Sequence, residues 1–107
     1  MARIIGKGYT FDDVLVTPKY NKVVSRKDVV LKTQVTKNHF LDMPLIASNM
    51  DTICEAKMAI AFGRMGGLGV LHRFCLIPEQ CSWVKEVKKT GLICAAAIGL
   101  KDLEQRV

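Results

Sequence analysis

Paired cysteines are the first thing that this 107-residue chain lacks. Its four cysteines, Cys54, Cys75, Cys81 and Cys94, are separated by 21, 6 and 13 residues. Structural zinc sites use closely spaced cysteine pairs, so we expect no metal site. None of the four has the surroundings that activate a thiolate, so we expect no catalytic residue among them. Their largely apolar neighbours predict reduced, mostly buried thiols in a cytoplasmic protein.

Long apolar runs are missing as well. The longest, such as residues 92–100, fall far short of the ~20 residues that cross a bilayer, so we expect no membrane partner. The N-terminus shows no basic-then-apolar leader, so we expect no secretion signal and a cytoplasmic location. Low-complexity segments are absent, and 50% of the residues are hydrophobic, which is typical of a folded domain rather than a disordered tail.

Acidic residues are scarce in the first part of the chain. The net charge is +6, and residues 1–40 hold eight Lys and Arg against three Asp, while residues 41–107 hold eight against seven acidic residues. A basic arm suggests an anionic partner, such as nucleic acid or a phosphorylated small molecule, although a solvated surface would carry the same charges. The basic residues are scattered among few aromatics, so nucleic acid is not the partner we expect.

The composition and hydrophobic pattern of the chain change near residue 43. Residues 1–43 are polar, basic and mostly irregular, with short apolar runs at residues 14–16 and 29–31. Partial alternation over residues 29–35 is typical of a half-buried strand. We therefore expect an N-terminal arm with a few short strands, followed in residues 44–107 by the first βα units of an incomplete domain.

Short apolar runs and amphipathic stretches alternate after that point. The runs at residues 44–47, 68–71 and 92–98 predict buried parallel strands. The stretches between them predict helices. A capping-box spacing opens a first helix of roughly 13 residues, and a proline in the first turn opens a second. The first helix starts at residues 52–55 and ends at Gly66-Gly67, and the second starts at Pro78 and ends at Gly91. Residues 102–107 begin a third helix.

Strands that alternate with helices predict right-handed crossovers and a parallel sheet, and therefore an α/β fold. A small open sheet fits this order, and so does the N-terminal portion of a (β/α)8 TIM barrel, which takes about 250 residues. The chain ends within the first turns of a helix, and three strands alone would leave both sheet edges open. We therefore expect about three strands of a barrel.

Polar residues follow the first two predicted strands, where parallel sheets bind their ligands. Ser48 and Asn49 offer a hydroxyl and an amide that suit a ribose, a phosphate or a base edge, and Met50 offers a soft wall for a flat ring. Arg73 could hold a phosphate in bidentate fashion, and His72 could stack on an adenine. The alternative is a surface arginine and a partly buried histidine.

Several blocks, taken in order, resemble the IMP dehydrogenase/GMP reductase family. Residues 10–18 (TFDDVLVTP) resemble the opening of IMP dehydrogenases, and residues 25–29 (SRKDV) resemble a run of GMP reductases. Residues 44–52 (PLIASNMDT) resemble the first-barrel-strand signature of both. The match continues in register through residues 66–72 (GGLGVLH) and 78–80 (PEQ).

This resemblance implies a (β/α)8 barrel, a homotetramer when complete, and chemistry at C2 of a purine nucleotide. It implies a GMP reductase, which converts GMP and NADPH to IMP and ammonia, or an IMP dehydrogenase, which converts IMP and NAD to XMP. Typical IMP dehydrogenases insert a pair of CBS modules between the second helix and the third strand. Here residues 87–91 run straight into Leu92, which favours GMP reductase. An IMP dehydrogenase without the insert and a non-catalytic truncated relative stay open.

The resemblance also implies the ligands and the residues that meet them. The family's catalytic cysteine loop and its site for a monovalent cation such as potassium fall outside this chain, so we expect a ligand-binding N-terminal fragment that is inactive alone. Ser25 and Arg26 would reach the cofactor of a neighbouring subunit. The implied nucleotide-binding residues are Ser48, Asn49 and Met50, and the implied cofactor-binding residues are Ser25, Arg26, His72 and Arg73.

Overall fold

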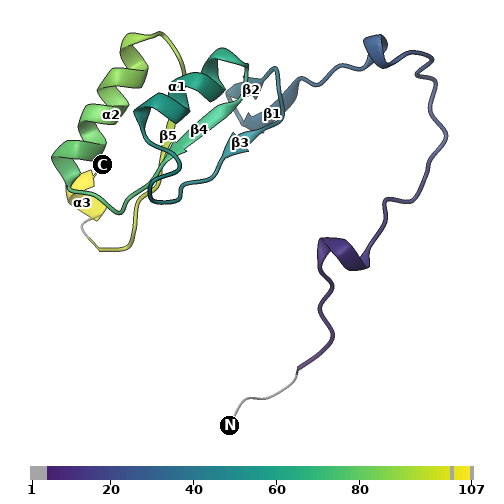
Figure 1. Cartoon of the computed structure of the whole chain (residues 1–107), viewed down its shortest axis with the longest axis horizontal. Coiled ribbons are helices and arrows are strands. Elements are labelled where there is room, and N and C mark those ends of the chain that lie inside the picture. Colours follow the sequence, from purple (N-terminus) through teal and green to yellow (C-terminus); the bar gives the residue numbers. More distant parts are fainter. Residues whose placement is uncertain (1–4, 102, 107) are drawn as a thin grey trace.

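The computed structural model describes residues 5–101 and 103–106. Residues 5–32 form an extended segment that leaves the rest of the molecule, as Figure 1 shows. The radius of gyration is 18.3 Å, against about 13 Å for a compact domain of this length. Two short 3-10 turns, η1 (Phe11–Asp13) and η2 (Arg26–Asp28), interrupt the segment.

Each 3-10 turn is held by its own capping box. At η1 the Asp13 carboxylate accepts hydrogen bonds from the backbone N–H and the hydroxyl of Thr10, at 2.9 and 3.0 Å. These bonds hold the pKa of Asp13 below its usual value, because they stabilise the charged form. At η2 the Ser25 N–H donates to the Asp28 carboxylate, and the Ser25 hydroxyl accepts from the Lys27 N–H. Both turns are therefore local structure that needs no support from the body.

The strands form two sheets in the α/β body, which is residues 33–101 and 103–106. An antiparallel pair is followed by a parallel sheet in the order β3-β4-β5. The hairpin precedes the parallel sheet and lies beside the beginnings of its strands (Figure 1). The bounds are β1 (Thr33–Thr36), β2 (His39–Leu41), β3 (Ile46–Ala47), β4 (Leu68–Leu71) and β5 (Ala95–Ala96).

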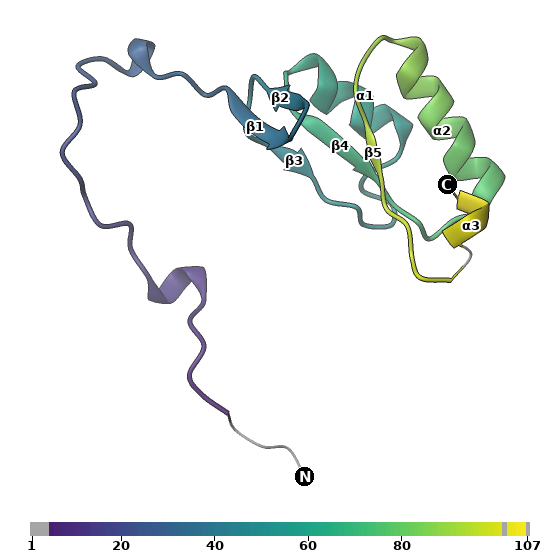
Figure 2. The ribbon, with the colours of Figure 1, turned by 180° about the vertical axis from the view of Figure 1, so that it is seen from behind.

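The helices α1 (Ala56–Arg64) and α2 (Ile77–Lys89) connect these parallel strands, and α3 (Leu103–Arg106) follows β5. Figures 1 and 2, seen from opposite sides, place α1 and α2 on the same face of the sheet. Successive strands add in one direction with their helices on one face, which is how a barrel grows. A doubly wound sheet would reverse direction and use both faces.

The core of the body lies between α1, α2 and the sheet. Gly69 on β4 allows the closest approach, because a Cβ at this position would overlap the backbone of Ala59 on α1. No helix among the described residues is long and apolar enough to cross a membrane. The buried core residues are Ala47, Cys54, Ala56, Ala59, Leu71 and Val87.

Several local predictions are wrong. The first helix has nine residues and begins at Ala56 after Glu55, because Thr52 has a φ of 61° and cannot cap it. The half-buried strand predicted over residues 29–35 is shorter and shifted, since β1 covers Thr33–Thr36 and residues 29–34 are exposed. The strand predicted at residues 44–47 is reduced to β3 (Ile46–Ala47), and Ile46 is half-exposed because β3 is the edge strand among the described residues. The four thiols are not mostly buried: Cys54 alone is buried, and Cys81 is exposed.

The third predicted strand is much shorter than expected. Residues 92–98 were predicted as one buried run, but β5 comprises Ala95–Ala96. The second helix agrees well with its predicted start at Pro78 and end at Gly91. Of the third predicted helix, residues 102 and 107 lie outside the described part of the chain.

Candidate functional site

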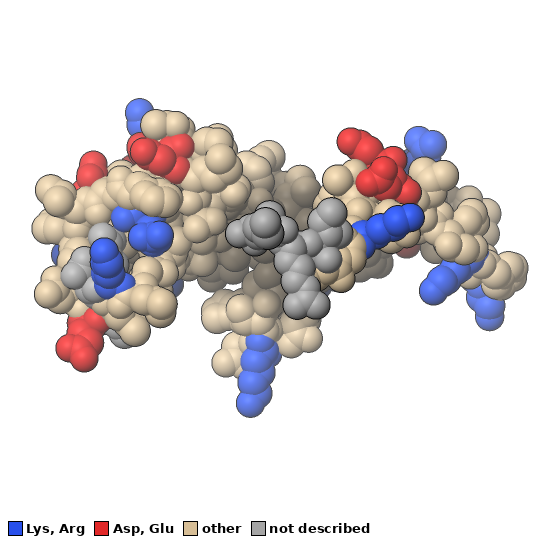
Figure 3. All heavy atoms as spheres, turned by 90° about the horizontal axis from the view of Figure 1, so that it is seen from below, with Lys and Arg blue, Asp and Glu red and all other residues tan. Residues whose placement is uncertain are grey.

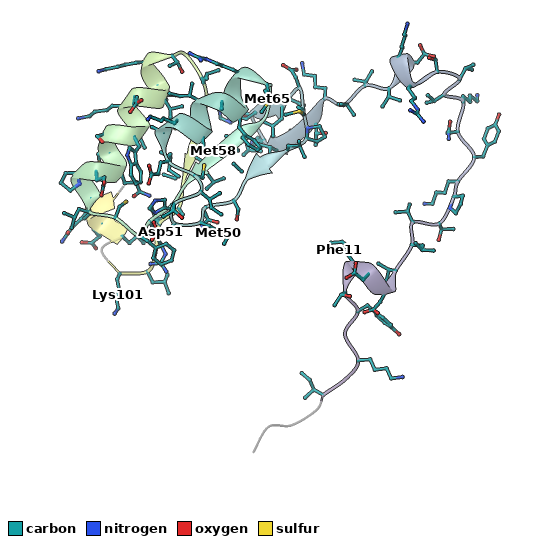
Figure 4. The ribbon with its side chains drawn as sticks, viewed as in Figure 1. Phe11, Met50, Asp51, Met58, Met65 and Lys101 are labelled. Carbon is teal, nitrogen blue, oxygen red and sulfur yellow. The ribbon has the colours of Figure 1, made fainter. Side chains whose placement is uncertain are left out.

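The chain leaves β3 through a tight turn at the carboxyl end of the sheet. The Met50 N–H donates to the Ser48 carbonyl at 2.9 Å, and the Met50 carbonyl accepts from the N–H groups of Ile53 and Cys54. Ser48, Asn49 and Met50 are all exposed. Figure 4 shows Met50, Asp51 and Lys101 at the same end of the body, with Met65 at the opposite end. The turn therefore presents three side chains at the strand ends.

His72, directly after β4, lies beneath this turn. It is 2% exposed, and its backbone N–H donates to the Cys54 carbonyl at 3.2 Å. Its Nδ1 accepts from the Phe74 N–H at 3.1 Å, which places the proton of the neutral ring on Nε2. The ring packs against Trp83 of α2, with the ring centres 5.0 Å apart.

The Nε2 of His72 faces two carboxylates. It lies 3.7 Å from Asp51 Oδ1 and 3.9 Å from Glu55 Oε1, too far for hydrogen bonds. Within the described part of the chain this nitrogen has no hydrogen-bond partner. His72 therefore joins the β3 turn to the end of β4 from inside the body, with almost no surface of its own to offer a ligand.

Arg73 is the exposed neighbour of His72. Its guanidinium lies over the Phe74 ring, with the carbon Cζ 4.9 Å from the ring centre. It also lies across the end of the third strand, since a Cβ built at Gly99 would come within 3.1 Å of its Nη1 atom. The fold thus brings the exits of β4 and β5 together at one cationic group.

Ser25 and Arg26 do not join this site. They belong to η2 in the extended segment, which Figure 1 shows well away from the strand ends of the body. Both are exposed. Their predicted role at the cofactor of a neighbouring subunit stays a prediction.

Gln80 is a buried polar residue at the strand ends that sequence reasoning did not single out. It lies in the first turns of α2 and is 5% exposed. Its carboxamide donates to the carbonyls of His72 and Ala97, at 2.9 Å each. Its position after Pro78 and Glu79 places it in the first turns of a helix. No pattern in the sequence shows that its side chain reaches the carbonyls at the ends of two strands.

Two of the thiols, those of Cys54 and Cys94, are unsuited to nucleophilic chemistry. Burial raises the pKa of the Cys54 thiol, and a weaker opposing effect comes from the backbone at Val70. Burial also raises the pKa of Cys94, which Lys88 partly offsets. A raised pKa lowers the thiolate fraction at neutral pH.

Fold and site together define a class, the TIM-barrel proteins, whose ligands bind at the carboxyl ends of the strands. The family model described as "IMP dehydrogenase / GMP reductase domain" matches residues 8–107. The chain belongs to the IMP dehydrogenase/GMP reductase family. The predicted α/β barrel portion and the family resemblance are both confirmed.

Relatives from both branches of the family match. The GMP reductase of Leishmania donovani is 51% identical over 83 residues, which are 78% of this chain and 17% of that protein. The inosine-5'-monophosphate dehydrogenase of Nitrosopumilus maritimus is 44% identical over 87 residues, 81% of this chain and 18% of the relative. The chain spans less than a fifth of the length of these curated relatives.

A solved structure supports the same placement. The GMP reductase of Trypanosoma brucei in complex with guanosine 5'-triphosphate superimposes with a TM-score of 0.72 at 52% sequence identity. The match covers 79% of this chain and 20% of that one. Family members carry names of NAD(P)-dependent oxidoreductases of purine metabolism.

Proposed function

We propose that the protein to which this chain belongs is a purine nucleotide oxidoreductase acting at purine C2, namely a GMP reductase. In this reaction GMP, NADPH and a proton would give IMP, NADP⁺ and ammonia: the bound cofactor would supply a hydride to C2, and the C2 amino group would take up the proton as it leaves. The observation that carries this choice is the identity of 51–52% to GMP reductases, against 44–46% to IMP dehydrogenases.

The exposed turn after β3 is the proposed nucleotide contact. Ser48 and Asn49 supply a hydroxyl and an amide, groups that hydrogen-bond ribose, phosphate and base edges. Met50 is 54% exposed and supplies a polarisable thioether for a flat ring. The T. brucei relative, solved with a guanine nucleotide, supports a purine nucleotide as the ligand class.

Arg73 is the proposed cofactor contact. Its exposed guanidinium at the exits of β4 and β5 suits the anionic phosphates of NADPH, or of NAD in the alternative reaction. His72 belongs to the same proposed site through its buried ring, which packs behind Arg73 and under the β3 turn. Ser25 and Arg26 would serve the cofactor of a neighbouring subunit in a homotetramer.

Nucleic acid is not part of the proposal. Figure 3 looks onto the lower side of Figure 1, where the strand ends lie, and shows the Lys and Arg side chains on that face as separate groups. We further propose a cytoplasmic location, and a monovalent cation such as potassium in the complete enzyme. The apolar surroundings of the cysteines support the location, and family resemblance supports the cation.

The deciding experiment compares the two reactions in the full-length protein. The protein is incubated with GMP and NADPH, and separately with IMP and NAD, while the absorbance of reduced nicotinamide is followed. We expect a fall in absorbance with GMP and NADPH, and no rise with IMP and NAD. A rise with IMP and NAD alone would show the protein to be an IMP dehydrogenase.

An IMP dehydrogenase without the CBS insert is the second candidate. The blocks at residues 66–72 and 78–80 favour it, and α2 passes to β5 through Thr90 and Gly91 with no insertion between these described elements. Relative length does not separate the branches, because the matched GMP reductases and several IMP dehydrogenases are covered to a similar 17–18%. No turnover of either pair would favour a non-catalytic relative.

A further inference from the structure

The ladder between β4 and β5 ends just before the proposed cofactor site. Its last bond runs from the Ala97 N–H to the Leu71 carbonyl, at 2.8 Å. Beyond it the carbonyls of His72 and Ala97 point toward α2 instead of a neighbouring strand. Two acceptors side by side repel each other and need donors once they are buried.

Gln80 donates to both carbonyls from one group, and the His72 carbonyl also accepts a weaker, longer hydrogen bond from the Cys75 thiol at 3.7 Å. A carboxamide nitrogen carries two N–H bonds, and the Nε2 of Gln80 lies 2.9 Å from the His72 carbonyl and 2.9 Å from the Ala97 carbonyl. Since both partners are acceptors, the nitrogen and not the oxygen must face them. One side chain therefore continues the pairing of two strands after their backbone ladder has stopped.

The two hydrogen bonds of Gln80 form a bridge between the strand ends, and this bridge fixes the position of the Arg73 guanidinium. Arg73 follows His72 directly, and Gly99 lies two residues after Ala97, so the separation of the two carbonyls sets the separation of these neighbours. The guanidinium of Arg73 lies close against Gly99, where a Cβ would be 3.1 Å from Nη1 and 3.4 Å from Cζ. Small changes at the bridge would therefore move Arg73 relative to the end of β5.

We propose that Gln80 is a positioning residue for the nicotinamide-cofactor site, which it serves by tying the strand-end carbonyls of His72 and Ala97 so that Arg73 stays against Gly99. The inference rests on the proposed function of Arg73. Gln80 itself touches no ligand, because it is 5% exposed and its donors are used within the fold.

The test is a double-mutant cycle in the full-length protein. Gln80→Met keeps the length of the side chain and removes both donors, and Arg73→Ala removes the group that Gln80 is proposed to position. NADPH affinity is measured by the fluorescence of the bound cofactor, GMP affinity by calorimetry, and folding by the thermal midpoint. We expect Gln80→Met to weaken NADPH binding about tenfold and GMP binding less than about twofold.

The double variant, with both Gln80→Met and Arg73→Ala, is the decisive measurement. If Gln80 acts through Arg73, Gln80→Met should weaken NADPH binding no further once Arg73 is alanine. Fully additive losses would overturn the proposal. So would equal losses for NADPH and GMP together with a lowered thermal midpoint, because they would mean that the substitution only destabilises the body.

Gly99→Ala covers the case in which Gln80→Met does not fold. The added methyl meets the flexible end of Arg73 rather than backbone, so folding should persist while NADPH binding weakens several-fold. Unchanged NADPH binding in Gly99→Ala would contradict the proposal. If the unsubstituted protein binds NAD instead, the cycle is run with NAD; if it binds neither cofactor, the proposed function fails and the inference with it.

Discussion

His72 and Arg73 are adjacent in sequence and opposite in environment. His72 is 2% exposed and surrounded by Trp83, Asp51 and Glu55, whereas Arg73 is exposed over the Phe74 ring. Consecutive side chains of a strand point to opposite sides, and at the end of β4 the inward position falls to His72. The sequence predicted both as ligand residues, because the residue type does not show whether a side chain at the end of a strand faces the core or the solvent.

Cys54 should be the least reactive thiol of the chain. Its side chain is fully buried and burial raises its pKa, so both access and thiolate fraction are low. Treated with iodoacetamide at neutral pH, the native chain should carry the label at Cys81 early and at Cys54 only after unfolding, as read by mass spectrometry of peptides.

Cys81→Ser provides the matched control for this labelling. It should remove the early label and leave Cys54 protected. Labelling of Cys54 in the native chain at the rate of Cys81 would mean that the contact between α1 and the sheet opens readily.

Helix α2 and strand β4 followed their sequence patterns closely, and α1 did not at its start. A proline in the first turn and a glycine after the last turn act locally, so they marked α2 correctly. The capping-box spacing at residues 52–55 instead meets a turn in which the Met50 carbonyl accepts from Ile53 and Cys54. Cys54, at the end of that turn, is fully buried in the core, a tertiary contact that a local sequence pattern does not encode.

Gly69→Ala should push α1 away from β4. The new methyl would overlap the Ala59 backbone on α1, and helix backbone moves much less easily than a side-chain end. We expect a loss of about 3 kcal/mol in the free energy of unfolding, measured by urea denaturation followed by circular dichroism. Gly8→Ala adds the same methyl where nothing lies within 4 Å and should change nothing; a neutral Gly69→Ala would refute the close approach.

The molecule as a whole combines a folded α/β body with a long extended segment. The sequence predicted an irregular arm over residues 1–43, but it could not show that residues 5–34 would all be exposed. Large apolar side chains lie among them, including Phe11, Leu15 and Val24, each 96% exposed. Such surface normally packs against protein, and residues far away in sequence or another subunit would have to supply the partner.

Removal of residues 1–30 should leave the body of this chain as stable as before. The hydrogen bonds of η1 and η2 are local, so the body loses no described support. We expect a change below about 0.5 kcal/mol in the free energy of unfolding, measured by denaturation of both chains under one condition. A clear loss of stability would show that the segment folds back onto the body in solution.

Helix α2 connects the carboxyl ends of the strands to an exposed turn at the opposite end of the body. Near its start Gln80 ties the exits of β4 and β5, and at its far end Thr90 and Gly91 form an exposed turn into the next strand. Thirteen residues at 1.5 Å each make a stiff rod about 20 Å long. A domain inserted at that turn, as in typical IMP dehydrogenases, would therefore contact one end of a stiff helix whose other end is bonded to the proposed ligand-binding edge. A tilt of α2 would then move that edge as a rigid body.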